Sequence, residues 1–398
     1  MDITIYPRKL RGSIDAIPSK SQAHRLLICA AFADKATLLI CPETNQDIEA
    51  TVGCLNALGA DIRRTADGYI VTPISCPPEK AVLNCFESGS TLRFMLPIVG
   101  ALGINTTFYM AGRLPMRPLS PLWEEMERNG CSLSRPTENT ILCQGKLSGT
   151  EYVIDGGISS QFITGLLFAM ALIPSTSTLT ITGKIESKPY IDMTHQALRM
   201  FGVDTTDNII RSCYPFSSPG TIRVEGDWSN GAFFLAANAL GCNLEINGLN
   251  PNSHQGDRAC QQILNALTEN TTVYAENIPD LVPILSVVAG AFNGATFKNI
   301  QRLRMKESDR VETVAAMLRS LGATVITDEN SIIIYPAKFR SCTIHSAGDH
   351  RIAMAAAIAA CVADGPITIT GAECVAKSYP AFWDVYRKLG GHYEQYVR

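Results

Sequence analysis

One local pattern recurs six times along this chain. An amphipathic run ends in a large apolar residue, glycine usually follows, and β-prone residues come next. Because glycine tolerates the left-handed conformation that ends a helix, each copy predicts a helix stop followed by a strand. The copies lie roughly 50 to 70 residues apart, which favours six strand–helix–strand modules over one doubly wound sheet. Single junctions of this kind are common, so an ordinary α/β fold stays an alternative here. The runs end at Leu58-Gly59, Asn129-Gly130, Phe201-Gly202, Leu267, Leu321-Gly322 and Leu389-Gly390, and the fourth has no glycine.

Length and composition exclude several classes of protein. With 398 residues and 46% hydrophobic content, the chain can bury large cores, and we expect about two domains. A net charge of −3 is not the basicity of a nucleic-acid binder. The thirteen cysteines form no C-x-x-C pair and no histidine lies at metal-ligand spacing from them, so neither a zinc site nor a disulfide framework is expected. The apolar stretches 281–292 and 352–362 are shorter than the roughly 18 residues of a membrane span, and the N-terminus has no apolar signal core. We therefore expect a cytoplasmic protein with reduced thiols.

Cations and small hydroxyl residues occur together where apolar helical patterns begin. The first N–H groups of a helix and the positive end of its dipole attract anions, and a neighbouring Lys or Arg adds to that attraction. Neither a dinucleotide G-x-G-x-x-G nor a Walker G-x-x-x-x-G-K-[ST] motif is present, so each such segment predicts a separate phosphate or carboxylate site. The segments are residues 19–25, 89–93, 159–161 and 349–351, each with a capping Ser, Gly or Asp.

Nine short motifs follow one another along nearly the whole chain. They are Ile17-Pro18-Ser19-Lys20-Ser21 with Arg25, Glu87-Ser88-Gly89-Ser90-Thr91-Leu92-Arg93-Phe94, Arg117-Pro118, Ile158-Ser159-Ser160-Gln161-Phe162, Ser187-Lys188-Pro189-Tyr190, Ile278-Pro279-Asp280, Leu303-Arg304-Met305-Lys306-Glu307-Ser308-Asp309-Arg310, Asp349-His350-Arg351 and Ala376-Lys377. In this order they resemble the 5-enolpyruvylshikimate-3-phosphate synthase family. Each motif alone is a weak signal, but nine in register are a strong one.

The resemblance implies transfer of the enolpyruvyl group of phosphoenolpyruvate to the 5-hydroxyl of shikimate 3-phosphate, with release of phosphate, on the shikimate route to chorismate and the aromatic amino acids. It implies the family's α/β fold, a two-domain inverse α/β barrel with six βαβαββ repeats, three per domain. One domain would hold residues 1–14 and 226–398 and the other residues 15–225, with the active site in the cleft between them. We expect a monomer that closes on shikimate 3-phosphate, binds neither nucleic acid nor membrane, and is inhibited by glyphosate through a pocket at Gly89.

The chemistry of this reaction calls for two carboxylates with opposite initial protonation. Addition protonates the methylene carbon and deprotonates the attacking hydroxyl, and elimination of phosphate reverses both steps. By the resemblance, Asp280 is the base toward the hydroxyl and Glu307 is the proton donor, assisted by Lys20. Taken alone, Asp280 would be a turn residue and Glu307 a helix-face partner of Arg310.

The resemblance also assigns the substrate ligands. Planar guanidinium groups bind carboxylates and phosphates through paired hydrogen bonds, so we expect anion charge to be met by Arg and Lys without metal or organic cofactor. The phosphoenolpyruvate ligands are Lys20, Gly89, Arg117, Gln161, Arg310, Arg351 and Lys377. The shikimate 3-phosphate ligands are Lys20, Ser21, Arg25, Ser159, Ser160, Gln161, Ser187, Tyr190, Asp280 and Lys306.

Four nearby residues stand outside these two ligand sets. Arg93 is either a ligand contact or a helix-face ion pair, and His350 is expected to be structural. Glu87 and Arg302 stand where the family frequently has Asn, and at residue 302 this chain lacks the Asn that often reaches the sugar-like substrate.

Two other functions stay open at this point. UDP-N-acetylglucosamine enolpyruvyl transferase shares the fold but uses a Cys in the loop before the Arg-Pro pair. Residues 112–116 hold no Cys, and Cys131 lies beyond that loop, which disfavours this alternative. A catalytically silent phosphometabolite-binding protein could keep the anion sites, but the matched carboxylates and lysines are all retained.

Overall fold

The computed structural model describes residues 1–267 and 271–396. The chain divides into two compact units: unit 1, Met1–Ile17 with Glu225–Arg398, and unit 2, Pro18–Val224. It therefore passes from one unit to the other twice, after Ile17 and after Val224.

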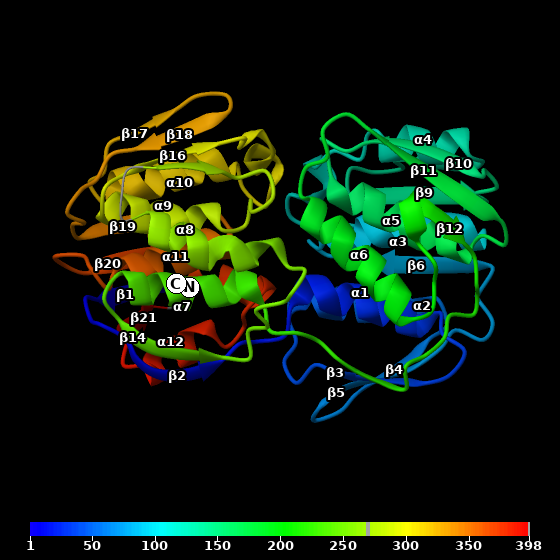
Figure 1. The fold of residues 1–398 in the computed structure, drawn as a ribbon, viewed down its shortest axis with the longest axis horizontal. Coiled ribbons are helices and arrows are strands. Elements are labelled where there is room, and N and C mark those ends of the chain that lie inside the picture. The colour runs from blue at the N-terminus through cyan, green and yellow to red at the C-terminus, as the bar shows by residue number, and fades with distance from the viewer. Residues whose placement is uncertain (268–270, 397–398) are drawn as a thin grey trace. The chain divides into compact units, whose positions relative to one another are not determined.

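Unit 2 contains three sheets and six α-helices (Figure 1). The sheet orders are β13-β3-β5-β4, β6-β7-β9-β8 and β10-β11-β12. The strands are β3 (Thr37–Ile40), β4 (Asp61–Arg64), β5 (Gly68–Thr72), β6 (Lys80–Asn84), β7 (Asn105–Tyr109), β8 (Cys131–Ser134), β9 (Thr140–Gly145), β10 (Glu151–Asp155), β11 (Thr176–Thr182), β12 (Ile209–Arg211) and β13 (Thr221–Arg223). The helices are α1 (Lys20–Ala31), α2 (Gln46–Ala57), α3 (Gly89–Leu102), α4 (Leu122–Arg128), α5 (Ser160–Leu172) and α6 (Lys188–Met200).

Unit 1 repeats this plan in its described residues. Its sheet orders are β15-β16-β18-β17, β19-β20-β1-β21 and the pair β14-β2. The strands are β1 (Asp2–Tyr6), β2 (Arg11–Asp15), β14 (Asn243–Asn247), β15 (Thr271–Tyr274), β16 (Ala295–Lys298), β17 (Val325–Thr327), β18 (Ser331–Ile334), β19 (Cys342–His345), β20 (Ile367–Thr370) and β21 (His392–Tyr396). The helices are α7 (Trp228–Ala239), α8 (Cys260–Ala266), α9 (Val282–Ala291), α10 (Arg310–Ser320), α11 (His350–Ala359) and α12 (Phe382–Lys388).

The repeating module is clearest in two places. In unit 2, β6 pairs parallel with β7 across α3, and β8 and β9 then form an antiparallel hairpin, with β9 beside β7. In unit 1, β15, α9, β16, α10, β17 and β18 follow the same order and pairing. Elsewhere a distant strand completes the sheet: β1 lies between β20 and β21, so both ends of the described chain belong to one sheet. Three sheets in each unit confirm the predicted sixfold architecture.

The predicted helix stops are also confirmed. Helices α2, α4, α6, α10 and α12 each end one residue before a large cap residue, and the glycine that follows has φ between +80° and +108°. Such φ values favour glycine, which has no Cβ to clash. The fourth run is α8, which is followed by Leu267, and residues 268–270 lie outside the described part of the chain.

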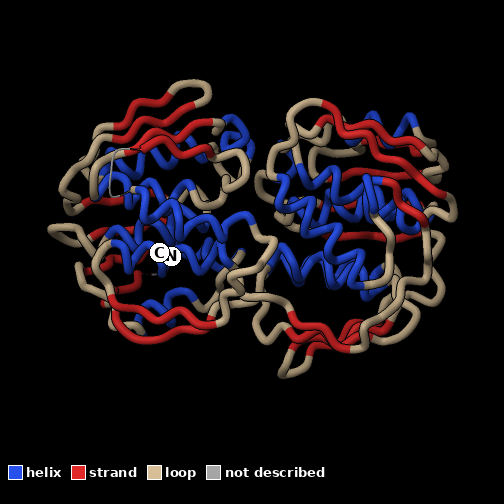
Figure 2. The backbone as a smooth tube through the Cα atoms, viewed as in Figure 1, coloured by secondary structure: helices blue, strands red, loops and turns tan. Residues whose placement is uncertain are grey.

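Three helices of each unit are buried almost all round. All ten residues of α11 and 12 of the 14 residues of α3 are buried, as are most residues of α1, α5, α7 and α9. A helix without a polar face must be covered on every side. Within each unit, Figure 2 shows these helices inside and the strands around them. The charged residues of this interior therefore gather where the helices begin. No helix in the described residues is both long enough and apolar enough to cross a membrane.

Candidate active site

Helix starts in unit 2 carry one group of predicted site residues. Ser19 is the residue before α1, and Ser159 caps α5 by accepting a hydrogen bond from Gln161 N at 3.3 Å. At α3 the cap is Ser88, whose Oγ accepts from Thr91 N, and Gly89 is the first helical residue. The sequence predicted Gly89 as the cap of α3. Ser88 caps the helix instead, because a side-chain cap needs an oxygen that glycine lacks.

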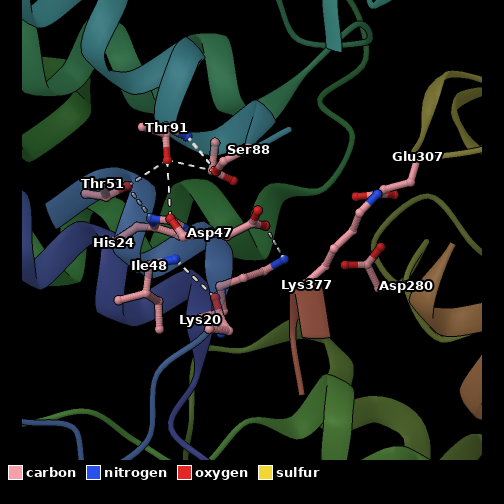
Figure 3. Close-up of polar contacts among 12 residues, drawn as sticks. Lys20, His24, Asp47, Ile48, Thr51, Ser88, Thr91, Asp280, Glu307 and Lys377 are labelled. Carbon is pink, nitrogen blue, oxygen red and sulfur yellow. Dashed lines mark hydrogen bonds and ion pairs between the residues drawn. The ribbon is translucent and has the colours of Figure 1, made fainter. Parts of the chain in front are cut away.

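Lys20 is paired within unit 2. Its Nζ lies 2.8 Å from Oδ2 of Asp47 in the first turn of α2, and both side chains are less than one-fifth exposed (Figure 3). The sequence analysis missed Asp47, because an acidic residue in a first helical turn is ordinary and gives no sign of a site.

Gly89 lies directly against the guanidinium of Arg117. A Cβ added at Gly89 would stand 2.6 Å from Arg117 Nη1 and 3.3 Å from Arg93 Nη1. Arg117 Nε is buried and has no hydrogen-bond partner among the described residues. The start of α3 thus brings N–H groups to a guanidinium group with unused hydrogen-bonding capacity, which is the arrangement expected of an anion site.

Gln161 links α5 to this turn. Its Oε1 accepts from Arg93 Nη1 at 2.6 Å and its Nε2 donates to Ser90 Oγ at 2.9 Å. Arg93 also donates through Nη2 to the Pro118 carbonyl at 3.0 Å. Arg93 therefore connects the α3 and α5 starts to the segment that carries Arg117.

Arg25 is built into the interior of unit 2. It is 2% exposed, and its guanidinium donates to the carbonyls of Ser21 and Tyr190 and to the hydroxyls of Thr164 and Thr194. Burial lowers the pKa of Arg25 to about 10, which leaves it charged at neutral pH. Its charge thus stands close to the predicted ligands Ser21 and Tyr190.

Helix starts in unit 1 carry the second group of site residues. Arg310, the first residue of α10, is fully buried and contacts three carboxylates. Its Nη1 lies 2.9 Å from Asp280 Oδ1, its Nη2 lies 2.6 Å from Glu307 Oε2, and its Nε lies 2.9 Å from Asp349 Oδ2. The two expected catalytic carboxylates are therefore held by one guanidinium group. Asp349 also caps α11 by accepting from Arg351 N at 3.0 Å.

Asp280 lies among three cations. Besides Arg310, its carboxylate meets Arg351 Nη2 at 2.9 Å and Lys306 Nζ at 3.7 Å. Burial alone would raise the pKa of Asp280, but Arg351, Lys306 and Arg310 together hold it well below its usual range. Burial lowers the pKa of Lys306 to about 8; Arg310 and Arg302 also lower it, while Asp280 opposes them. Asp280 is therefore ionised here.

Lys377 lies on another segment of unit 1. It ends the short 3₁₀ helix η5 (Ala372–Lys377), and its Nζ donates to the Gly348 carbonyl at 3.1 Å. In Figure 3 its side chain extends toward the Glu307 carboxylate.

Comparisons with known proteins agree over nearly the full length. The family model for EPSP synthase (3-phosphoshikimate 1-carboxyvinyltransferase) matches residues 5–386. The chain belongs to the EPSP synthase family. A 3-phosphoshikimate 1-carboxyvinyltransferase from Clostridium beijerinckii is 36% identical over 430 residues and covers 99% of both chains. One from Clostridium botulinum (strain Eklund 17B) is 37% identical over 425 residues, covering 98% of each.

Solved structures of EPSP synthase and of a further enolpyruvyl transferase share the fold. EPSP synthase from Acinetobacter baumannii superposes with a TM-score of 0.80 at 23% identity, covering 99% of this chain and 100% of that one. The enolpyruvyl transferase NikO from Streptomyces tendae gives a TM-score of 0.78 at 16% identity, covering 100% and 99%. At these identities the likeness concerns the fold alone, and it confirms the predicted enolpyruvyl transferase fold.

The remaining residues that the EPSP synthase resemblance singled out lie at helix starts or in short segments. Ser160 is the first residue of α5, and Ser187, at the start of α6, has a positive φ of 55°. His350 is the first residue of α11 and is 1% exposed, a position that suits a structural residue. Arg302 lies in the 3₁₀ helix η4 (Gln301–Met305). Within the described residues, no group of three or more His, Cys, Asp or Glu side chains could hold a metal ion.

Proposed function

We propose that this protein transfers the enolpyruvyl group of phosphoenolpyruvate to the 5-hydroxyl of shikimate 3-phosphate and releases phosphate. The observation that carries the proposal is the EPSP synthase family match over residues 5–386. Full-length relatives carry the name of this activity. The unit 1 carboxylates and the cations of both units supply the residue types that the reaction needs.

The reaction proceeds by addition and then elimination. Asp280 accepts the proton of the 5-hydroxyl as its oxygen attacks C2 of phosphoenolpyruvate, and Glu307, assisted by Lys20, gives a proton to C3. In the elimination, Glu307 takes a proton back from the methyl group so formed, the C2–O bond to phosphate breaks, and Asp280 gives its proton to the departing phosphate, which leaves the enol ether and inorganic phosphate. Each carboxylate thus accepts one proton and donates one proton in a full reaction cycle.

Binding of phosphoenolpyruvate should make Asp280 a stronger base than it is in the ligand-free protein. A carboxylate whose pKa is held far below its usual range is a weak base. Arg310 and Arg351, which lower that pKa, are also the proposed ligands of the phosphoenolpyruvate anionic groups. When these guanidinium groups turn to the substrate, the pKa of Asp280 rises toward the range of a useful base.

The proposed ligands come from both units. Phosphoenolpyruvate takes Lys20, Gly89, Arg117 and Gln161 from unit 2 and Arg310, Arg351 and Lys377 from unit 1. Shikimate 3-phosphate takes Lys20, Ser21, Arg25, Ser159, Ser160, Gln161, Ser187 and Tyr190 from unit 2 and Asp280 and Lys306 from unit 1. The proposal therefore requires the units to bring both sets of side chains to one substrate pair, with shikimate 3-phosphate favouring closure.

Two alternative functions are not favoured. A UDP-N-acetylglucosamine enolpyruvyl transferase or a silent phosphometabolite-binding protein would not explain why full-length relatives are 3-phosphoshikimate 1-carboxyvinyltransferases. We propose further that the enzyme acts as a cytoplasmic monomer without metal or organic cofactor.

An assay of phosphate release tests the proposal. Purified protein should release phosphate from phosphoenolpyruvate only when shikimate 3-phosphate is present, and EDTA should leave the rate unchanged. UDP-N-acetylglucosamine in place of shikimate 3-phosphate should give none. A protein that binds both substrates but releases no phosphate would instead be the silent binding protein.

A further inference from the structure

A chain of buried hydrogen bonds crosses three helices of unit 2 behind the proposed phosphoenolpyruvate ligands. His24 Nδ1 on α1 lies 2.7 Å from Thr51 Oγ1 on α2, and this oxygen lies 2.8 Å from Thr91 Oγ1 on α3. Thr91 Oγ1 donates to Ser88 Oγ at 2.7 Å. The side chains of His24, Thr51 and Thr91 are completely buried, and Figure 3 shows the hydrogen bonds that join them and Ser88. We call these four residues the relay.

Three of the four relay members stand one helical turn beyond a residue at a helix start, and the fourth, Ser88, is itself at such a start. His24 is four residues after Lys20 on α1, and Thr51 is four residues after Asp47 on α2. Thr91 is three residues after Ser88, which caps α3 directly before Gly89. Residues at these spacings share a helix face. The relay therefore joins the three first turns that present Lys20, its partner Asp47, and the Gly89 turn.

The relay also touches two of these turns directly. Ser88 Oγ accepts from both the N–H and the hydroxyl of Thr91, and Thr91 Oγ1 lies 3.4 Å from the Asp47 carbonyl oxygen. The Asp47 carboxylate in turn holds Lys20 at 2.8 Å. A shift of α3 against α2 would thus change the placement of Lys20 relative to Gly89 and to Arg117, which lies against it.

The hydrogen bonds run in one direction. A hydroxyl has one proton, so Thr91, which donates to Ser88, must accept from Thr51, and Thr51 must accept from His24. His24 is then the neutral tautomer with its proton on Nδ1. This agrees with its Nε2, which is buried without a hydrogen-bond partner among the described residues. Burial also lowers the pKa of His24 to about 3.

We propose that His24, Thr51 and Thr91 are positioning residues that fix Lys20 and the Gly89–Arg117 anion site relative to one another for phosphoenolpyruvate. The inference rests on the proposed function. Small displacements of substrate ligands cost much of the rate, so breaking the relay should impair the use of phosphoenolpyruvate more than it impairs the fold. Shikimate 3-phosphate shares Lys20 and Gln161 with phosphoenolpyruvate, but most of its proposed ligands lie on α1, α5 and α6, so its binding should change much less.

The test uses shape-conserving variants that remove one hydroxyl. Thr51→Val and Thr91→Val should each lower kcat/KM for phosphoenolpyruvate by about tenfold. The Kd for shikimate 3-phosphate, measured by calorimetry, should stay within about twofold. The double variant should lose little more than either single one, because the relay is already broken. Thr51→Ser and Thr91→Ser keep the hydroxyl and should restore most of the loss, and they also serve if a valine variant fails to fold.

Thr37→Val is the matched control. Thr37 is also completely buried in unit 2, and its hydroxyl lies 2.7 Å from Ser218 Oγ, in a hydroxyl pair that includes none of the proposed ligands. This variant should lower the melting temperature about as much as Thr51→Val does and leave the kinetics unchanged. A merely structural relay would make the two variants kinetically alike, and that result would overturn the proposal.

A second readout does not depend on turnover. Long-range ¹H–¹⁵N spectra of protein with ¹⁵N-labelled histidine rings should show His24 protonated at Nδ1 at pH 7, with that signal shifted in Thr51→Val. An Nε2-protonated ring would contradict the stated direction of the relay.

If wild-type protein releases no phosphate from the two substrates, the proposed function itself fails. Wild-type turnover with normal kinetics in both valine variants would reject the relay proposal alone.

Discussion

At the scale of single residues, Arg310 sets the charge environment of the carboxylates at the proposed active site. One fully buried guanidinium group contacts Asp280, Glu307 and Asp349. Removing a carboxylate from such a cluster leaves a buried charge short of a partner, so the amide is the least disruptive replacement.

Asp280→Asn and Glu307→Gln should each lower kcat by roughly 10²-fold or more, because each amide keeps the shape but cannot transfer the proton. Steady-state phosphate release measures this, with binding of shikimate 3-phosphate as a check on the fold. Glu312→Gln, an exposed carboxylate in the first turn of α10, is the control and should retain normal turnover. Near-normal turnover in either site variant would remove that residue from its role.

Lys306 should give shikimate 3-phosphate binding a pH dependence. With a pKa lowered to about 8, Lys306 is a cation below that pH and becomes neutral above it. Attraction for the dianionic substrate is therefore present at pH 7 and lost as the pH rises through 8. The Kd from calorimetry should rise between pH 7 and pH 9, whereas Lys306→Arg should keep a flat profile. A steep rise that persists in Lys306→Arg would assign the titration to another group.

Gly89→Ala should discriminate between inhibitor and substrate. Gly89 has no positive φ, so alanine fits the backbone, but its methyl would lie 2.6 Å from Arg117 Nη1 and must displace that guanidinium group. Glyphosate is longer than phosphoenolpyruvate, and its inhibition constant should weaken by about tenfold more than the KM for phosphoenolpyruvate. Equal losses would place Gly89 away from the pocket that holds both.

Sequence could nominate Lys20, Asp280 and Glu307 and the local pairing of Glu307 with Arg310, but not the partner of Lys20 from another helix. Asp47 is far from Lys20 along the chain, and no local pattern marks the contact. Arg25 was expected only as a ligand, yet it also joins α1 to α5 and α6 from inside unit 2. Pairing across elements depends on tertiary packing, which residue spacing does not encode.

At the scale of elements, local chemistry predicted the ends of helices well. Glycine stops after α2, α4, α6, α10 and α12 and caps at Ser159 and Asp349 follow from backbone and hydrogen-bond rules that act within a few residues. The start of α3 shifted from the expected Gly89 cap to Ser88. Which helices pack together was not visible, because the buried helices are apolar on all sides.

The packing of α3 against α5 should tolerate no added methyl at Gly165. A Cβ there would clash with the backbone carbonyl of Arg93, which cannot move as a side chain could. Gly165→Ala should destabilise the protein by about 2 to 3 kcal/mol in thermal or denaturant unfolding. Gly53→Ala on the exposed face of α2 meets nothing within 4 Å and should stabilise it by about 0.5 to 1 kcal/mol. Equal effects of the two substitutions would contradict the close approach of α3 and α5.

At the scale of the whole molecule, the sequence predicted the sixfold repeat but not which distant strands complete the sheets. The strand β1 completes a sheet with β20 and β21 from the other end of the chain, and β13 joins β3 across most of unit 2. Such pairings join distant segments, so periodicity predicts the number of modules without saying which strands complete them. The family resemblance placed residues 1–14 in one domain with residues 226–398 but did not say which strands pair.

The central claim is that one chain transfers an intact enolpyruvyl group between two substrates. Phosphoenolpyruvate labelled with ¹³C at C2 follows that group directly in an NMR time course with the wild-type protein and shikimate 3-phosphate. The account predicts that the label moves into an enol ether on the 5-oxygen of shikimate 3-phosphate while one inorganic phosphate appears for each label transferred. Label appearing as pyruvate, or phosphate released without shikimate 3-phosphate, would contradict it.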